Sequence, residues 1–196
     1  ANAVDHYEEE HDFIVFDYGI MKRRTTPAHE PGGKPEVDQH PLIFPNTLRH
    51  VLKDKINGRI RHNVQCRVPI DDTHTQVYMV LFEPDAKAQT PAQSVTPFET
   101  YDLFNEDGSF RVDKVLGQDA MAWVTQGPIA DRTVERLGAA DVGIVKYRRM
   151  LITQMEAVAK GDMPHGTVAD TDKDRPIEFD VINERIGVNV PEKVAS

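Results

Sequence analysis

The sequence predicts an α+β domain in which an antiparallel sheet packs against a long C-terminal helix. Residues 58–70 alternate apolar and polar positions, and residues 75–83 form the stretch richest in β-branched and aromatic side chains. Between Ile144 and Val158, apolar residues recur every three or four positions, which is typical of a helix with one apolar face. Strands followed by helices favour a sheet with the helices on one of its faces.

The first elements are less regular. Residues 12–21 are aromatic and β-branched, so they predict a single strand. Residues 25–39 contain three prolines and two glycines and predict a surface loop. Pro41 and Pro45 interrupt the next apolar run, which favours an edge strand or an irregular segment because proline donates no backbone hydrogen bond.

The two strongest strands lie close together in the chain and are joined by residues 71–74, Asp-Asp-Thr-His, a composition that favours a turn. We therefore expect a β-hairpin there. Residues 84–97 predict a loop without regular structure.

The last third of the chain changes to a helical period. We expect Asp141 to be the N-cap of the long helix, and Lys160 and Gly161 to mark its end. A shorter helix is expected over residues 118–125. The apolar stripe of the long helix consists of Ile144, Tyr147, Leu151, Met155 and Val158.

Composition limits the class of protein. The formal net charge of −9 makes nucleic acid an unfavourable partner, because an acidic surface repels phosphates. No stretch approaches the ~20 apolar residues of a membrane helix, so no membrane is expected. Cys66 is the only cysteine, which excludes an internal disulfide and fits a cytoplasmic protein. We expect residues 1–12 to be a linker or frayed start, residues 13–160 the main domain and residues 161–196 an extension packing on it.

Single residues give weak signals of chemistry. His6 and His11 are five apart, a spacing that allows one metal ion, but the glutamates between them favour a solvated linker. His62 lies on an apolar face, which favours a half-buried structural histidine. Asp119 has Leu116, Met121 and Trp123 near it in the sequence, and a carboxylate in apolar surroundings needs a partner, a proton or a metal. From the pattern alone, an Asp119 on the surface of a helix is about as well supported as a functional Asp119.

Four ordered motifs resemble the large subunits of Rieske non-haem iron oxygenases. Residues 67–75, RVPIDDTHT, are similar to a signature of that family. Residues 118–132, QDAMAWVTQGPIADR, resemble its phthalate-dioxygenase-like branch, as do YGIMKRR at 18–24 and HPLIFPN at 40–46. The second motif continues through Glu135, Leu137, Gly138, Asp141 and Tyr147-Arg148-Arg149. The branch includes O-demethylases of lignin-derived aromatics and phenoxybenzoate dioxygenases.

The resemblance implies a helix-grip (START-like) fold, an antiparallel sheet curled around a long helix. It also implies a mononuclear Fe(II) held by two histidines and one carboxylate. Carried over to this chain, the carboxylate is Asp119, as metal ligand and catalytic residue, with Gln118 as a residue that orients it. The family's Rieske [2Fe-2S] cluster and both iron histidines are expected upstream. The substrate pocket is expected to include Trp123, Phe44, Val64 and Met79.

The implied activity is hydroxylation or O-demethylation of a small aromatic substrate with O₂. Electrons would come from NAD(P)H through a separate reductase or ferredoxin, and the enzyme would be a homo-oligomer, expected to be a trimer. His6 and His11 share the H-x-x-x-x-H spacing of the family's iron histidines, but Ala3 and Glu10 depart from that pattern, so we do not assign them as ligands. The alternative is a non-catalytic helix-grip module that binds small aromatic or lipid-like ligands, and a third possibility is a piece that mainly builds an oligomer interface.

Overall fold

The computed structural model describes residues 9–28, 31–53, 58–83, 95 and 97–168, and the backbone of residues 182–183 and 188–189. The described residues form two compact units. The first unit is drawn from residues 1–68, 77–84 and 137–196, and the second from residues 69–76 and 85–136. The domain boundaries that we expect at residues 12 and 160 stay a prediction.

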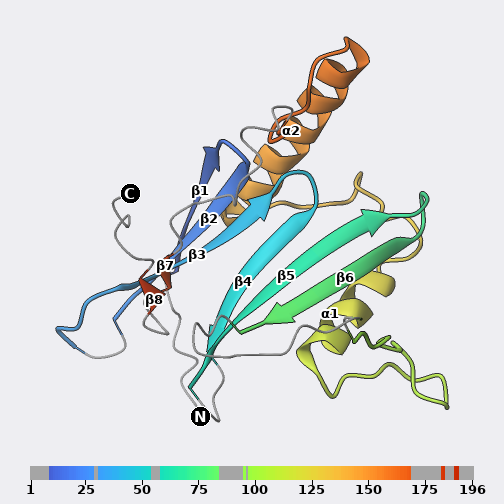
Figure 1. Cartoon of the computed structure of the whole chain (residues 1–196), viewed down its shortest axis with the longest axis horizontal. Helices are drawn as coiled ribbons and strands as arrows, with labels where there is room; N and C mark the ends of the chain where they lie inside the picture. The colour runs from blue at the N-terminus through green and yellow to red at the C-terminus, as the bar shows by residue number, and fades with distance from the viewer. Residues whose placement is uncertain are drawn as a thin grey trace. The chain divides into compact units, whose positions relative to one another are not determined.

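Six strands follow one another in a sheet of order β1-β2-β3-β4-β5-β6 (Figure 1). The ladders from β1 to β5 are antiparallel. With the helix α2, they confirm the predicted α+β class, in an arrangement consistent with a helix-grip fold. The strands are β1 (Glu10–Phe16), β2 (Gly19–Thr26), β3 (Glu36–Ile43), β4 (Thr47–Lys53), β5 (Ile60–Pro69) and β6 (Thr75–Phe82).

The first two strands form a hairpin, so the single strand predicted over residues 12–21 is wrong. Their ladder runs from Glu10 opposite Thr25 to Phe16 opposite Gly19. Gly19 lies so close to the backbone of Leu42 and Phe44 that no Cβ would fit, and only glycine allows this tight return of the chain. Because β1 starts at Glu10, the last three residues of the expected linker belong to the sheet.

The third strand corrects two further expectations. The surface loop predicted over residues 25–39 is shorter, because β2 continues to Thr26 and β3 begins at Glu36. Pro41 lies inside β3, between two other strands, and is fully buried. A proline is tolerated there because the ladder from β3 to β4 contains only Leu42 opposite Leu48 and Ile43 opposite Thr47. Beyond it, β3 pairs with β7 (Ile182–Asn183), which pairs with β8 (Val188–Asn189).

The predicted hairpin of β5 and β6 is confirmed, with strand bounds within two residues of those expected. The Asp71 carboxylate accepts hydrogen bonds from the backbone N–H groups of Thr73 and His74, both at 2.8 Å. This side-chain-to-backbone bonding makes the turn that the composition predicts. The loop expected over residues 84–97 falls outside the described residues, except for positions 95 and 97.

The long helix α2 (Val142–Ala159) packs on the β1–β2 hairpin through its first two turns (Figure 1). Gly143 lies directly against the Phe13 ring. The Lys146 ammonium donates to the Phe13 carbonyl at 2.7 Å, and the Tyr147 hydroxyl donates to the Pro45 carbonyl at 2.9 Å. The N-cap is Asp141, as predicted, although its carboxylate accepts from the N–H of Gly138 rather than from the helix.

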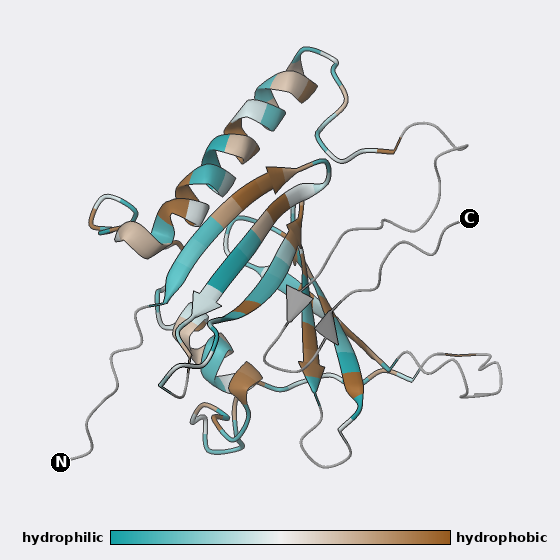
Figure 2. Cartoon of the chain, turned by 90° about the vertical axis from the view of Figure 1, so that its left-hand side faces the viewer, coloured by the Kyte–Doolittle hydropathy of each residue, from teal (hydrophilic) through white to brown (hydrophobic). Residues whose placement is uncertain are grey.

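The face of α2 that packs differs from the predicted stripe. Tyr147 and Leu151 are half-buried, but Ile144, Met155 and Val158 are exposed in this chain. Hydrophobic and hydrophilic residues are mixed along the helix (Figure 2). The contact with β1 is made by a glycine, whose missing side chain adds nothing to the apolar pattern of the sequence. The predicted apolar stripe is therefore about one position away from the face that packs.

The second unit contains the shorter helix α1 (Val115–Val124), which begins three residues earlier than predicted. Residues before it fold back as a small hairpin, with a bridge between Phe104 and Phe110. The buried Gly117 lies against the carbonyl of Arg111 and the hydroxyl of Tyr101, where a side chain would not fit. A 3-10 turn, η1 (Ala139–Asp141), precedes α2 in the first unit. Among the helices that the structure describes, none is long and apolar enough to cross a membrane.

Candidate functional site

Asp119 lies in the middle of α1 and is exposed. The buried residues of this helix are Gly117 and Ala120, and Trp123 keeps 39% of its surface exposed. The energetic argument from apolar surroundings is therefore wrong for Asp119 in this chain. Its assignment as a metal ligand depends on the family motif and stays a prediction.

The other predicted site residues are spread over both units. Gln118 is exposed and donates from Nε2 to the Val112 carbonyl at 2.9 Å, so its amide helps to hold the segment before α1. Phe44 is buried, with its ring centroid 6.4 Å from that of Tyr147 on α2. Val64 and Met79 are half-buried on β5 and β6. A hollow in the second unit is lined by Asn105 and residues 110–113, none of them a predicted pocket residue.

The described residues do not by themselves build an iron site. Within them there is no group of three or more His, Cys, Asp or Glu side chains that could hold a metal ion. His6 falls outside the described residues, and His11 on β1 has its Nε2 3.5 Å from a carboxylate oxygen of Glu9.

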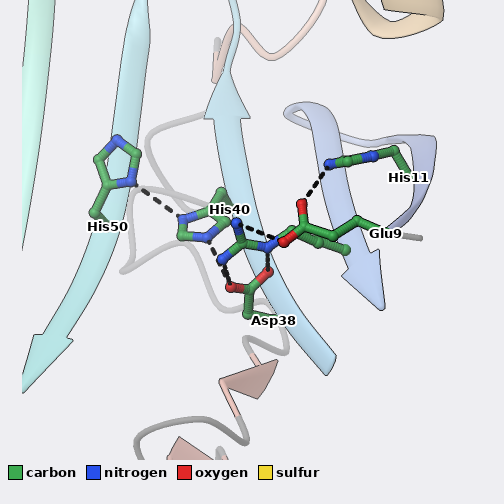
Figure 3. Close-up of polar contacts among 6 residues, drawn as sticks. Glu9, His11, Asp38, His40 and His50 are labelled. Atoms are coloured by element: carbon green, nitrogen blue, oxygen red, sulfur yellow. Dashed lines mark hydrogen bonds and ion pairs between the residues drawn. The ribbon is translucent and has the colours of Figure 1, made fainter. Parts of the chain in front are cut away.

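A connected group of polar side chains lies on the first unit's sheet, and we call Glu9, Arg24, Asp38, His40 and His50 the Asp38 cluster. Figure 3 labels its members Glu9, Asp38, His40 and His50. Arg24 on β2 and Asp38 on β3 face each other across the ladder. The Arg24 guanidinium donates to both carboxylate oxygens of Asp38, at 3.0 Å from Nε to Oδ1. A second carboxylate, that of Glu9, lies 3.7 Å from the same guanidinium.

Asp38 is a buried anion. Its side chain is only 3% exposed. Burial opposes ionisation, but the interactions with His40 and Arg24 outweigh it and hold the pKa of the Asp38 carboxyl well below its usual range. The hydrogen bond to Asp38 likewise raises the pKa of the Arg24 guanidinium. The pair therefore stays charged at neutral pH.

Two histidines continue the cluster. His40 Nε2 lies 3.6 Å from an Asp38 oxygen, and His40 Nδ1 lies 3.1 Å from His50 Nδ1 on β4. Figure 3 shows the two rings facing each other from neighbouring strands. Sequence reasoning missed both residues, although His40 stands in the HPLIFPN motif, because nothing in the sequence pairs position 40 with position 50.

Two further histidines in the described part of the chain have structural partners, as the sequence favoured for His62. His62 stacks on Phe82 with centroids 4.9 Å apart, and its Nδ1 lies 2.8 Å from Arg49 Nη2. Burial and the nearby Arg49 charge lower the pKa of His62. His74 Nδ1 lies 2.9 Å from the Asp71 carboxylate within the turn, so it helps to hold that turn.

Comparison with known proteins defines the class. Residues 103–183 match the family described as "LigXa C-terminal domain like". Taken with the α+β sheet, the docked C-terminal helix and the ordered motifs, this match agrees with the predicted resemblance to the C-terminal part of an oxygenase large subunit. The chain belongs to the Rieske non-haem iron oxygenases.

Two curated relatives make the placement more specific. The chain is 32% identical over 173 residues to the oxygenase subunit of 5,5'-dehydrodivanillate O-demethylase from Sphingobium sp. (strain NBRC 103272 / SYK-6). It is 33% identical over 149 residues to the oxygenase subunit of phthalate 4,5-dioxygenase from Pseudomonas putida. These alignments include 88% and 64% of this chain, but only 38% and 31% of the two relatives. The chain thus spans about a third of the length of the curated relatives it matches.

Proposed function

We propose that the protein containing this chain is an oxygenase that uses O₂ to hydroxylate an aromatic ring or to remove the methyl group of an aromatic methoxy substituent. The observation that carries the proposal is the similarity, over most of the chain, to two oxygenase subunits whose names specify an aromatic O-demethylase and an aromatic dioxygenase. A hydroxylated methoxy carbon collapses to a phenol and formaldehyde, so both reactions can begin with the same insertion of oxygen.

The proposed cofactors follow from the family. A mononuclear Fe(II), held by two histidines and Asp119, would supply the chemistry of O₂ activation. Its electrons would come from a Rieske [2Fe-2S] cluster, which NAD(P)H would reduce through a separate reductase or ferredoxin. Both histidines and the cluster ligands are expected upstream of this chain, in a cytoplasmic homo-oligomer that we expect to be a trimer.

Within this proposal, the residues of the chain have separate roles. Asp119 on α1 supplies a carboxylate that is exposed in the described part of the chain. Other parts of the protein can therefore pack over it. Gln118 holds the entry to α1 through the Val112 carbonyl. In the first unit, Lys146 and Tyr147 attach α2 to the rest of that unit by hydrogen bonds to the carbonyls of Phe13 and Pro45.

A reaction screen tests the proposal. A full-length oxygenase subunit containing this chain would be supplied with a surrogate reductase, NADH and a panel of aromatic carboxylates with and without methoxy groups. We expect O₂ uptake coupled to product for at least one member, with formaldehyde released only from the methoxy compounds. Tight binding of an aromatic ligand without any coupled O₂ uptake would refute the proposal and favour the non-catalytic binding module.

A further inference from the structure

The sheet is open where β3 and β4 meet. Their ladder contains only two pairs, the last of which is Leu42 opposite Leu48. Continuing that register by two residues places His40 opposite His50, where no ladder pair forms and β3 goes on to pair with β7 instead. The two imidazoles connect the strands at this opening, with ring centroids 5.1 Å apart.

The two histidines present the same ring nitrogen to each other. Their Nδ1 atoms are 3.1 Å apart. If the two rings are hydrogen-bonded, one Nδ1 must carry the proton and the other must accept it with its lone pair. His40 has its Nε2 towards Asp38, 3.6 Å from Oδ2. An ionised carboxylate beside Nε2 favours the proton there, which leaves the lone pair of His40 on Nδ1, facing His50.

The Asp38 carboxylate is suited to this role because it is fixed. Its side chain is 3% exposed and is held on its other side by the Arg24 guanidinium. A carboxylate that accepts from the outer N–H of a histidine is the arrangement found behind metal-binding histidines, where it sets the tautomer and the ring orientation. In the Asp38 cluster, His40 has its outer nitrogen at an ion-pair distance of 3.6 Å from such a carboxylate, and a second imidazole lies beside it.

We propose that His40 and His50 chelate a divalent transition-metal ion such as Zn²⁺ through their Nδ1 atoms, bridging β3 and β4. Two imidazole nitrogens at ~2.1 Å from one tetrahedral ion are roughly 3.4 Å apart, which is within a few tenths of an ångström of the observed separation. His40 keeps 21% of its side-chain surface exposed, so water can reach the ion and fill the positions that the protein does not. Imidazole ligands favour Zn²⁺, Cu²⁺ and Ni²⁺ over Mg²⁺ or Ca²⁺.

Metal binding at this position requires a change of tautomer at His50 and a small turn of the rings, because lone pairs that meet head-on in a hydrogen bond must converge on an ion beside the line between the two Nδ1 atoms. His50 moves its proton from Nδ1 to Nε2 by exchange with water, and the two Nδ1 lone pairs then bind the ion. No net proton is released when both rings start neutral. The site is distinct from the proposed iron site, because it uses neither Asp119 nor an upstream histidine, and it does not depend on oxygenase activity.

Calorimetric titration of the tag-free chain with Zn²⁺ tests the proposal, with Co²⁺ absorption as a second probe of nitrogen ligands. We expect about one ion per chain, a loss of at least tenfold in affinity for His40→Ala and for His50→Ala, and a loss of roughly 10–100-fold for Asp38→Asn. Saturating Zn²⁺ should also raise the thermal midpoint of the wild-type chain, but not that of either histidine variant.

The controls separate this site from other histidines. His11→Ala tests the pair suggested by the sequence spacing, and His74→Ala tests an exposed histidine of the second unit; neither should change Zn²⁺ affinity. Circular dichroism of each variant shows whether the fold is retained, so that lost binding reports a lost ligand. Wild-type affinity in His50→Ala, or no Zn²⁺ binding by the folded wild-type chain, would overturn the proposal.

Discussion

Replacing Gly143 by alanine tests how α2 is attached to the sheet. A Cβ added at Gly143 would lie 2.7 Å from Cγ of Phe13, and closer still to Cδ1 and Cε1 of the same ring. Separations under 3.0 Å are essentially never adopted by real Cβ atoms, so the ring or the helix must move. Phe13 is half-buried, which allows its ring to yield partly.

Two effects of opposite sign compete in Gly143→Ala. Overpacking against Phe13 should cost about 1–3 kcal/mol. Alanine in place of glycine inside a helix should stabilise the folded chain by about 1 kcal/mol, because alanine has the higher helix propensity. We therefore expect a net destabilisation of up to about 2 kcal/mol, which for a chain of this length lowers Tm by up to roughly 8 °C.

A double-mutant cycle provides the decisive measurement. Phe13→Ala removes the ring, so adding Gly143→Ala in that background should stabilise the chain by about 1 kcal/mol instead of destabilising it. Thr153→Ala, at an exposed position of α2, is the control for helix propensity and should be slightly stabilising. Urea and thermal unfolding of the four variants measure these differences. If Gly143→Ala stabilised the wild-type chain, the docking of α2 on Phe13 would be wrong.

Three further predictions concern carboxylates. Asp38→Asn should destabilise the chain by about 2 kcal/mol at pH 7, because it breaks the pair with the partly exposed Arg24. Since the folded pKa of Asp38 is lowered, its contribution is fully present above the unfolded pKa of about 3.9 and is lost progressively as pH falls from there towards the folded pKa. Urea midpoints of the wild type and Asp38→Asn should therefore approach each other steadily as pH falls below about 5, and parallel profiles would contradict this. Asp71→Ala should speed amide exchange at Ile70, whose N–H donates to the His74 carbonyl, while Asp71→Asn should not. In a full-length oxygenase subunit, Asp119→Ala should remove most of the mononuclear iron and the turnover but spare the visible spectrum of the Rieske cluster. Asp113→Ala is the control and should change neither. Full iron occupancy in Asp119→Ala would show that Asp119 is not a ligand.

Strands and helices with strong local patterns were predictable from the sequence. The alternation in β5 and the β-branched run of β6 specify half-buried strands, and the Asp71 turn needs no partner outside its own four residues. The period of α2, with Asp141 before it and Gly161 after it, specifies a helix in the same local way. In each case the residues that decide the structure are neighbours in the chain.

Elements that depend on distant contacts were not predictable. The turn between β1 and β2 depends on Gly19 meeting the backbone of Leu42, and Pro41 is accepted in a central strand only because the ladder to β4 is so short. The packed face of α2 is decided by the Phe13 ring, which lies far away in the sequence. None of these partners has a local signature.

By itself, the sequence determined the fold class, the two strongest strands, both helices and, through four motifs in a specific order, the oxygenase family and its candidate carboxylate Asp119. Only the tertiary structure decided that Asp119 is exposed in this chain and that Asp38, His40 and His50 form a connected group. The physical reason is register: positions 40 and 50 meet because β3 and β4 pair at Leu42 and Leu48, and strand pairing is set by the packing of the whole sheet.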